Sequence, residues 1–532
     1  MEQSGGRAVW KSSSNIETDY WSMKLCALIR LKVVTLSILN YSCVVLLLAL
    51  LSACSNTTVE QESQRGVTEL DSHVSPQGHN FTLAYMPDAE QVSFNLIWPN
   101  RWAHDNQVSV VSSLGVDLMS SGGAGDRSAE QVKRDIIKAE GIASVNATPD
   151  HIYAAITAKP ADLDDTLDVM VDVIGKPALD ESAFEALNTA LQQRVFVRLQ
   201  NPSARLWSAT RRVLLGDTPL TDYWNNQPEE RPLQSLEIDD VRRWHVETFN
   251  RDTVTVAIVG AIETDAAAVA VDRLLAQLPV GKTGSVSKST VTDPISHSLS
   301  GKTVLLQDQS VENTLIAMIG LLPASREGGE VSDIIAVGAL GEGKTSRLAR
   351  SGSEATEDSE VDSSVELPDE VTNELAVEIP EDEGSSISAS IANFSRSARV
   401  FGISAESDNK GVADTFSEIE QIYTDFKRGN LTDQEVLRGA VSFVTILQKN
   451  EQRVDLVAYG LGQLLLDELP VELLLSVTQD TLALGADDIN QRIIDRYPDW
   501  DSLLKVVISS DKNAIKADCI VTEFEELSAC DP

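Results

Sequence analysis

One stretch of the chain has the pattern of a nucleotide-binding loop. Gly338 to Thr345 reads GALGEGKT, which is glycine, four residues and then Gly-Lys-Thr. A loop of this kind holds phosphate with backbone amides and with the N-terminus of a long following helix. Here only Ser346 to Arg350 precede Ser351, and an acidic run that would repel phosphate begins at Glu354. We therefore expect this glycine loop to bind no nucleotide.

Histidine, the usual nitrogen ligand of catalytic zinc, is scarce and scattered. No two of the histidines stand four residues apart on a helix, which is the spacing that zinc peptidases use. We assign His151, in a predicted strand, and His245, on a predicted helix, to packing or to the surface. His104 is a weak candidate ligand. The six histidines are His73, His79, His104, His151, His245 and His297.

The N-terminal region reads as an export signal that begins at Met23. Basic residues between Lys24 and Lys32 precede an apolar run that ends in Val44 to Ala53. The 22 residues before Met23 are polar and unlike the start of a signal, so Met23 could be the true start of translation.

The signal ends in LSAC, Leu51 to Cys54, which resembles the lipobox of bacterial lipoproteins. That resemblance implies a mature chain that begins at Cys54 and carries diacylglycerol and palmitate there. Ser55 follows the cysteine, and in lipoprotein sorting this residue points to the outer membrane. We expect a lipid-anchored protein of the bacterial cell envelope that faces the periplasm.

Two cysteines remain after the signal and Cys54 are set aside. Cys519 and Cys530 form an even pair near the C-terminus. In an oxidising compartment such a pair favours a local disulfide over a metal site.

The chain is strongly acidic. Its 43 Lys and Arg and 81 Asp and Glu give a formal charge of −38, which opposes binding to nucleic acid and anionic lipid. The segment from Ser351 to Ser388 has no Lys or Arg, and thirteen Asp and Glu lie between Glu354 and Glu383. We interpret 351–388 as a solvated, disordered insertion. A docking role or a calcium loop is the alternative, although the carboxylates lack the regular spacing of a calcium loop.

Helices and strands must position these residues, and their patterns follow one order twice. Alternation predicts strands at Asn80 to Met86, Gln91 to Trp98 and His151 to Ala158 in the first pass. In the second pass it predicts strands at Thr303 to Asp308 and Asn313 to Gly320.

Two further signals mark helices and a duplication. Ser128 and Gln131 have capping-box spacing and predict the start of a helix after a glycine turn. The run Asp239 to Val241 with Phe249 corresponds to Asp487 to Ile489 with Tyr497, about 248 residues later.

We predict an α+β protein of two homologous units, each an antiparallel-rich sheet packed with helices. The expected division is signal 1–54, tether 55–78, first unit 79–285, linker 286–300, second unit 301–515 and tail 516–532.

Several phrases in this order resemble the insulinase, or pitrilysin-like, peptidase family. They include DRSAEQV (Asp126 to Val132), LLGDTPLTDYW (Leu214 to Trp224) and LGEGKTSRL (Leu340 to Leu348). The resemblance covers Asn80 to Lys512. It implies zinc on an inverted H-x-x-E-H motif, with a second glutamate about 75 residues further on.

The motif positions are degenerate in this chain. Alignment on the DRSAEQV phrase puts the two histidine positions at Leu114 and Leu118 and the catalytic glutamate at Asp117. The distal glutamate falls at Gln192 or Gln193. A leucine side chain has no atom that can bind zinc, so the resemblance implies that the zinc site has been lost.

The second unit of active relatives supplies an arginine and a tyrosine that hold substrate. Here the acidic insertion takes that place, and Arg350 is a weak candidate for the arginine. The glycine loop matches a loop that handles substrate in non-catalytic processing-peptidase subunits. Gly341 and Gly343 are therefore expected peptide contacts.

We predict an inactive, lipid-anchored peptidase homologue without a cofactor. It would bind peptide or regulate a zinc peptidase. It would pair with a zinc-bearing subunit of the family or with a second copy of itself. One alternative is an active zinc metallopeptidase with non-standard ligands, and another is a structural or assembly lipoprotein of the envelope.

Overall fold

The structure is a computed structural model that describes residues 66–104, 109–138, 141–225, 235–280, 300–343, 345–352, 387–451 and 453–530. The signal, Cys54, nearly all of the predicted linker and 353–386 of the acidic insertion lie outside these residues. In the described part, no helix combines the length and the hydropathy that crossing a bilayer requires.

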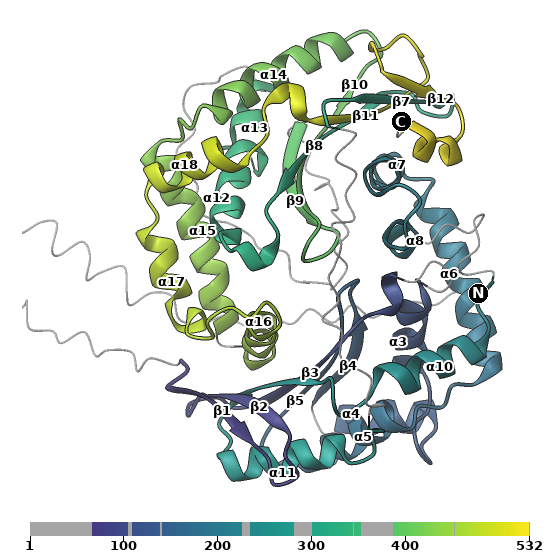
Figure 1. The fold of residues 1–532 in the computed structure, drawn as a ribbon, viewed down its shortest axis with the longest axis vertical. Coiled ribbons are helices and arrows are strands. Elements are labelled where there is room, and N and C mark those ends of the chain that lie inside the picture. The colour runs from purple at the N-terminus through teal and green to yellow at the C-terminus, as the bar shows by residue number, and fades with distance from the viewer. Residues whose placement is uncertain are drawn as a thin grey trace, which may run out of the picture. The chain divides into compact units, whose positions relative to one another are not determined.

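Two six-stranded mixed sheets form the framework of the described chain (Figure 1). We call 66–280 the first half and 300–530 the second half. The first sheet has the order β1-β2-β6-β3-β5-β4 and the second has the order β12-β7-β11-β8-β10-β9. Their strands are β1 (Glu69–Val74), β2 (Asn80–Tyr85), β3 (Val92–Pro99), β4 (Ile142–Ala147), β5 (His151–Ala158), β6 (Thr255–Gly260), β7 (Thr303–Gln307), β8 (Thr314–Leu322), β9 (Ile387–Asn393), β10 (Arg399–Ser407), β11 (Leu504–Ser509) and β12 (Cys519–Val521).

Equivalent strands pair in the same way in the two sheets. Three successive pairs at one end of each sheet run antiparallel, in the orders β6-β3-β5-β4 and β11-β8-β10-β9. Next to them, β2 with β6 matches β7 with β11 as a parallel pair. The outermost strands differ, because β1 is antiparallel to β2 whereas β12 is parallel to β7. The predicted fold class, α+β with two homologous units, is confirmed.

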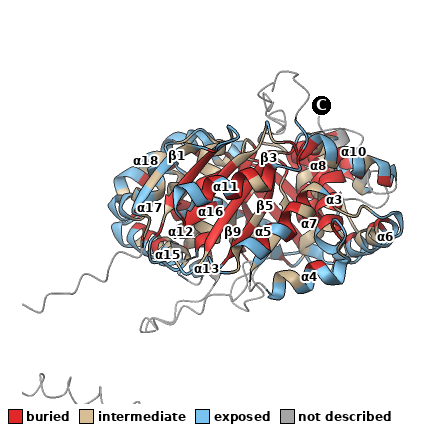
Figure 2. Cartoon of the chain, turned by 90° about the horizontal axis from the view of Figure 1, so that it is seen from below, coloured by how far each residue is buried: buried red, intermediate tan, exposed pale blue. Residues whose placement is uncertain are grey.

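Helices follow one order in each half. The first half has η1 (Trp102–His104), α3 (Val111–Ser121), α4 (Ala129–Lys138), α5 (Leu163–Gly175), α6 (Glu181–Arg198), α7 (Pro202–Leu215), α8 (Pro219–Asn225), α10 (Ile238–Thr248) and α11 (Thr264–Leu275). The second half has η3 (Ser325–Glu327), α12 (Glu330–Gly341), α13 (Arg347–Gly352), α14 (Val412–Lys427), α15 (Asp433–Glu451), α16 (Val454–Leu466), α17 (Leu473–Ala483), α18 (Ala486–Arg496), η4 (Trp500–Ser502) and η5 (Phe524–Cys530). The inner strands of both sheets are largely buried, whereas helices such as α15, α17 and α18 show exposed outer faces (Figure 2).

The halves exchange one helix each, as Figure 1 shows. Helix α7 of the first half packs on β8 and β11, and helix α16 of the second half packs on β3 and β6. Close approach of α16 depends on Gly462, because a Cβ there would lie 2.4 Å from Cδ1 of Ile97. Each sheet is therefore covered in part by the other half of the chain.

The boundaries at the two ends differ from the prediction. The segment expected as a tether, 55–78, contains β1, and the expected tail, 516–532, contributes β12 to the second sheet. Both are edge strands with few buried side chains, so they lack the apolar alternation that marks a strand in sequence. By contrast, His151 to Ala158 forms β5 with the predicted bounds. Ser128 and Gln131 make the predicted reciprocal capping box before α4.

Candidate functional site

Helix α3 carries the positions that the resemblance assigns to the metal. Leu114 and Leu118 are 0% and 1% exposed and belong to the apolar core of the first half. The indole of Trp244, on α10, lies directly against the helix backbone, since a Cβ on Gly115 would be 2.3 Å from its Cζ3 atom. The two leucines thus occupy a closely packed apolar interior.

Asp117, the degenerate catalytic position, belongs to a polar group on α3. Tyr223 of α8 is hydrogen-bonded to Ser113, one helical turn before Asp117. Burial raises the pKa of Tyr223, the hydrogen bond to Ser113 opposes this, and the charges of Asp150 and Asp117 raise the pKa further. The phenol therefore stays neutral and can act as a hydrogen-bond partner over the ordinary pH range.

The distal glutamate position also lacks an ionised ligand. Gln192 is half-buried on α6 and donates to the side-chain oxygen of Asn188 at 3.2 Å, and Gln193 is exposed. Among the described residues, no group of three or more His, Cys, Asp and Glu could hold a metal ion. These residues therefore do not fit the zinc site of the inverted motif.

Two histidines, His151 and His245, lie partly buried between packed elements. His151 begins β5, and burial, followed by the charge of Arg396, lowers its pKa to about 4. Nε2 of His245 lies 2.7 Å from the Ile174 carbonyl, and burial lowers the pKa of this histidine too. Both imidazoles are neutral near pH 7.

A polar junction joins the halves close to α3. The backbone N–H of Arg396, in the β9–β10 turn, donates to Oδ2 of Asp150 at 2.8 Å. The Arg396 guanidinium pairs with Asp467, the residue that follows α16. Burial raises the pKa of Asp150 to about 6, although the Arg396 N–H and charge act against this shift. The rings of Tyr153 and Tyr459 lie beside each other, 5.5 Å between centroids.

Sequence reasoning missed this junction. Asp150 and Arg396 are separated by 246 residues, and Arg396 belongs to none of the phrases or motifs found in the sequence. The one available signal was the position of Asp150 directly before the strand His151–Ala158, where a buried acid needs a partner.

The glycine loop follows α12. Gly341 is buried at the end of the helix, where an added Cβ would lie 2.3 Å from the backbone nitrogen of Ala389 on β9. Gly343 is exposed and adopts φ 73°, a left-handed conformation that favours glycine. Of the two expected peptide contacts, Gly343 faces solvent and Gly341 is covered by β9.

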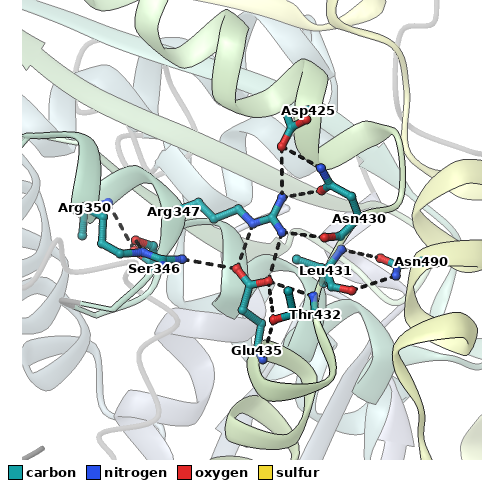
Figure 3. Close-up of polar contacts among 10 residues, drawn as sticks. Ser346, Arg347, Arg350, Asp425, Asn430, Leu431, Thr432, Glu435 and Asn490 are labelled. Atoms are coloured by element: carbon teal, nitrogen blue, oxygen red, sulfur yellow. Dashed lines mark hydrogen bonds and ion pairs between the residues drawn. The ribbon is translucent and has the colours of Figure 1, made fainter.

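Arginines after this loop are bonded to α15 (Figure 3). Arg347 donates to both carboxylate oxygens of Glu435, at 2.9 and 3.0 Å. Arg350, the weak substrate-holding candidate, donates to the Ser346 carbonyl and to Oε1 of Glu435 at 3.2 Å. Burial alone would raise the pKa of Glu435, but hydrogen bonds from Arg347 and Thr432 and the Arg347 charge lower it to about 2.

The tail cysteines lie together. Cys519 on β12 and Cys530 at the end of η5 form a disulfide with an S–S distance of 2.04 Å. The bond closes the tail over β7, because β12 pairs with that strand.

The fold is shared with known peptidases. No protein-family model and no curated protein sequence matches the chain. Among solved structures, the peptidase M16 inactive domain from Pseudomonas fluorescens superposes with a TM-score of 0.67 at 13% identity, covering 83% of this chain and 98% of that one. A protease from Helicobacter pylori gives 0.65 at 14% identity, covering 83% and 99%.

The periplasmic protease PqqL from Escherichia coli gives a TM-score of 0.64 at 11% identity. The match covers 85% of this chain and 48% of PqqL. The chain therefore has the fold of the M16, or insulinase-like, peptidases, and the predicted resemblance to that family is confirmed at the level of the fold.

Proposed function

We propose that the protein is a catalytically inactive insulinase-like peptidase homologue that binds peptide or regulates a zinc-bearing subunit. The observation that carries this proposal is the burial of Leu114 and Leu118 against an apolar core that contains Trp244. A buried apolar pair offers zinc neither a lone pair nor access. No bound zinc is expected, and Asp117 has no metal-bound water to activate.

Peptide binding is supported by an open sheet edge beside α3. Among the described strands, β4 pairs only with β5, and α3 packs against β4. An extended peptide can add to such an edge as a further strand. Ile142, at the start of β4, is 47% exposed and would offer an apolar contact to the added strand.

The same proposal covers location and partner. The LSAC sequence at Leu51 to Cys54 supports a lipid anchor on the envelope, and the periplasmic location of PqqL agrees with this compartment. The partner is a zinc-bearing protein of the same fold or a second copy of this chain. A negatively charged subunit suits basic, extended peptides.

Three measurements on the purified protein test the proposal. Elemental analysis should show no stoichiometric zinc, and peptide cleavage should be absent with and without a chelator. A fluorescent basic peptide should bind, and Ile142→Lys should weaken that binding about tenfold, equal to ~1.4 kcal/mol. Ile137→Lys is the matched control, because Ile137 is an exposed isoleucine on α4. Stoichiometric zinc or chelator-sensitive cleavage would overturn the proposal.

A further inference from the structure

A pocket lies where the C-terminal tail meets the second sheet. Its volume is about 540 Å³, a size that suits a small ligand or a single side chain. One wall is the end of β7 with the loop after it, residues 306–309, and another is residues 522–524 of the tail. Arg205 of α7 completes the lining, and α7 packs against η5 (Figure 1). We call this cavity the tail pocket.

The tail wall of the pocket is held from both ends. Strand β12 pairs with β7 directly before Thr522, and the disulfide between Cys519 and Cys530 closes the loop that contains the wall. The backbone N–H groups of Thr522 and Glu523 donate to Oε2 of Glu526, at 3.3 and 3.4 Å. A wall that is fixed in this way loses little conformational freedom when a ligand binds.

Two of the three charged groups in the lining are already paired. The Arg205 guanidinium forms an ion pair with Asp308 and donates to Oγ of Ser310 at 2.7 Å. The other oxygen of Asp308 accepts from the N–H and the hydroxyl of Ser310, at 2.8 and 2.7 Å. The Arg205 and Asp308 side chains are only 27% and 12% exposed. This pair therefore adds no net charge to the pocket.

The third charged group, Glu523, gives the pocket an uncompensated negative charge. Glu523 is exposed, and no group in the described part of the chain donates to its carboxylate. Gln307 and Gln309 add neutral acceptors beside it. The amide nitrogen of each donates to the Ser510 carbonyl, at 3.5 and 2.8 Å, so each Oε1 is left without a donor among the described residues.

This lining favours a ligand that is cationic and rich in donors. A primary ammonium group has three N–H donors and no acceptor. Phe524, half-buried, lines the same pocket, and an aromatic ring attracts a cation that lies over its face. We propose that the tail pocket binds an alkylammonium group, either that of a lysine side chain or that of a free amine. None of the lining residues belongs to α3 or β4, so this inference does not depend on the proposed peptidase-like function.

Saturation-transfer NMR on the full chain at low salt tests the proposal. The probe is N-acetyl-lysinamide, and N-acetyl-norleucinamide is the matched analogue without an ammonium group. The lysine probe should bind at least about fivefold more tightly, the size of one exposed ion pair. Equal binding of the two compounds, or no binding of the lysine probe, would overturn the proposal.

A third compound, n-butylamine, separates the two sources of the ammonium group. It carries the same charge without a peptide group. Binding as tight as that of N-acetyl-lysinamide would support a site for free amines, and weaker binding would support a site for a lysine side chain in a peptide.

A substitution locates the contact. Glu523→Gln removes the uncompensated charge and should weaken binding of N-acetyl-lysinamide about three- to fivefold. Glu312→Gln is the matched control, since Glu312 is an exposed glutamate between β7 and β8 that does not line the pocket. Equal effects of the two substitutions would show attraction to the acidic surface as a whole and would contradict the assignment. Circular dichroism confirms that each variant is folded.

Discussion

The fourth residues of α3 and α12 occupy equivalent places in the two halves and have opposite chemistry. In the first half that residue is Leu114, and it shares an apolar core with Trp244 and Phe249. Trp244 is the seventh residue of α10, and Phe249 directly follows the helix. Trp244 and Phe249 are both 0% exposed, and their rings meet edge to face at 5.5 Å.

In the second half the fourth residue of α12 is Asp333, which is 0% exposed. The seventh residue of α18 is Arg492, which donates to both Asp333 oxygens at 2.7 and 2.8 Å. Tyr497 follows α18 and donates to Asp333 at 3.3 Å, and the buried Arg399 donates from β10 at the same distance. An ion cluster thus fills the place that aromatic packing fills in the first half.

The difference shows that the fold accepts either apolar packing or a buried ion cluster at these equivalent positions. A buried charge is stable only when every polar group around it is bonded, whereas an apolar site is stable only when it is closely packed. The first half meets the second condition at Leu114, one of the positions that the family resemblance assigns to the metal. We therefore expect different kinds of substitution to destabilise the two halves.

The largest effect is expected from Asp333→Leu, which gives the second half the residue that the first half has. Arg399 and Arg492 would lose their shared counter-charge, and the free energy of unfolding should fall by about 3–5 kcal/mol. Urea unfolding measures the loss. Asp239→Leu is the control, because that side chain is 81% exposed and its removal should change stability by less than about 0.5 kcal/mol. A loss below about 1 kcal/mol for Asp333→Leu would mean that the cluster is not needed.

The comparison also shows what sequence could reveal. The strand His151–Ala158 was predicted with correct bounds because six of its eight side chains are buried and most of these are apolar. The metal positions were assigned from the phrase at Arg127 and Ser128, which set the register of the neighbouring helix, and this assignment stays a prediction. The loss of zinc itself stays a prediction.

The ion cluster and the Asp150 junction could not be predicted in the same way. Asp333 is 66 residues from Arg399 and 159 from Arg492, and ion pairs over such separations leave no periodic pattern. One signal was present, since Asp333 precedes the apolar run Ile334 to Leu340, where a helix is expected to be buried. Edge strands β1 and β12 were missed because an edge position needs little apolar surface.

The two edge strands give the next prediction. The disulfide between Cys519 and Cys530 spans 11 residues and holds β12 in place, while β1 has no covalent constraint. Replacing both cysteines with serine should cost roughly 2–3 kcal/mol, the loop entropy that the bond removes from the unfolded tail. Hydrogen exchange should show faster opening of β12 and no change in β1. Equal protection of β12 in the two proteins would contradict this prediction.

A substitution at the fifth position of α3 should cost less. In Gly115→Ala, the new methyl group would meet Trp244 at 2.3 Å, and such overpacking costs about 1–3 kcal/mol. In a Trp244→Leu background the same change should cost less, so a double-mutant cycle isolates the contact. The equivalent residue of α12, Ile334, is 38% exposed, and Ile334→Ala should cost under about 1 kcal/mol. Additive costs for Gly115→Ala and Trp244→Leu would contradict the packing described for the first half.

The smallest effects come from two carboxylates whose pKa values are displaced in opposite directions. The pKa of Asp150 rises from 3.8 to about 6 on folding, so its neutral form is the favoured one. The contribution of Asp150 to the free energy of unfolding is fully present below pH 3.8 and is lost as the pH rises through 6. Asp150→Asn keeps an acceptor for the Arg396 N–H and stays neutral. Because Asp150 is only half-buried, the variant should be more stable than the wild type by about 1–2 kcal/mol at pH 8, and equally stable at pH 4.

Glu435 in the second half provides the opposite case. The pKa of Glu435 falls from 4.5 to about 2 on folding. Its contribution to the free energy of unfolding is therefore fully present above pH 4.5 and is lost as the pH falls through 2. Glu435→Gln should destabilise the protein at pH 7 by about 1–2 kcal/mol, because two charge-assisted hydrogen bonds from Arg347 weaken. Thermal unfolding from pH 4 to pH 8 measures both variants. If both Asp150→Asn and Glu435→Gln destabilised the protein at pH 8, this prediction would be wrong. The Asp150 carboxylate would then be ionised and stabilised by its bonds at the junction between the halves, and burial would not be the main influence on its pKa.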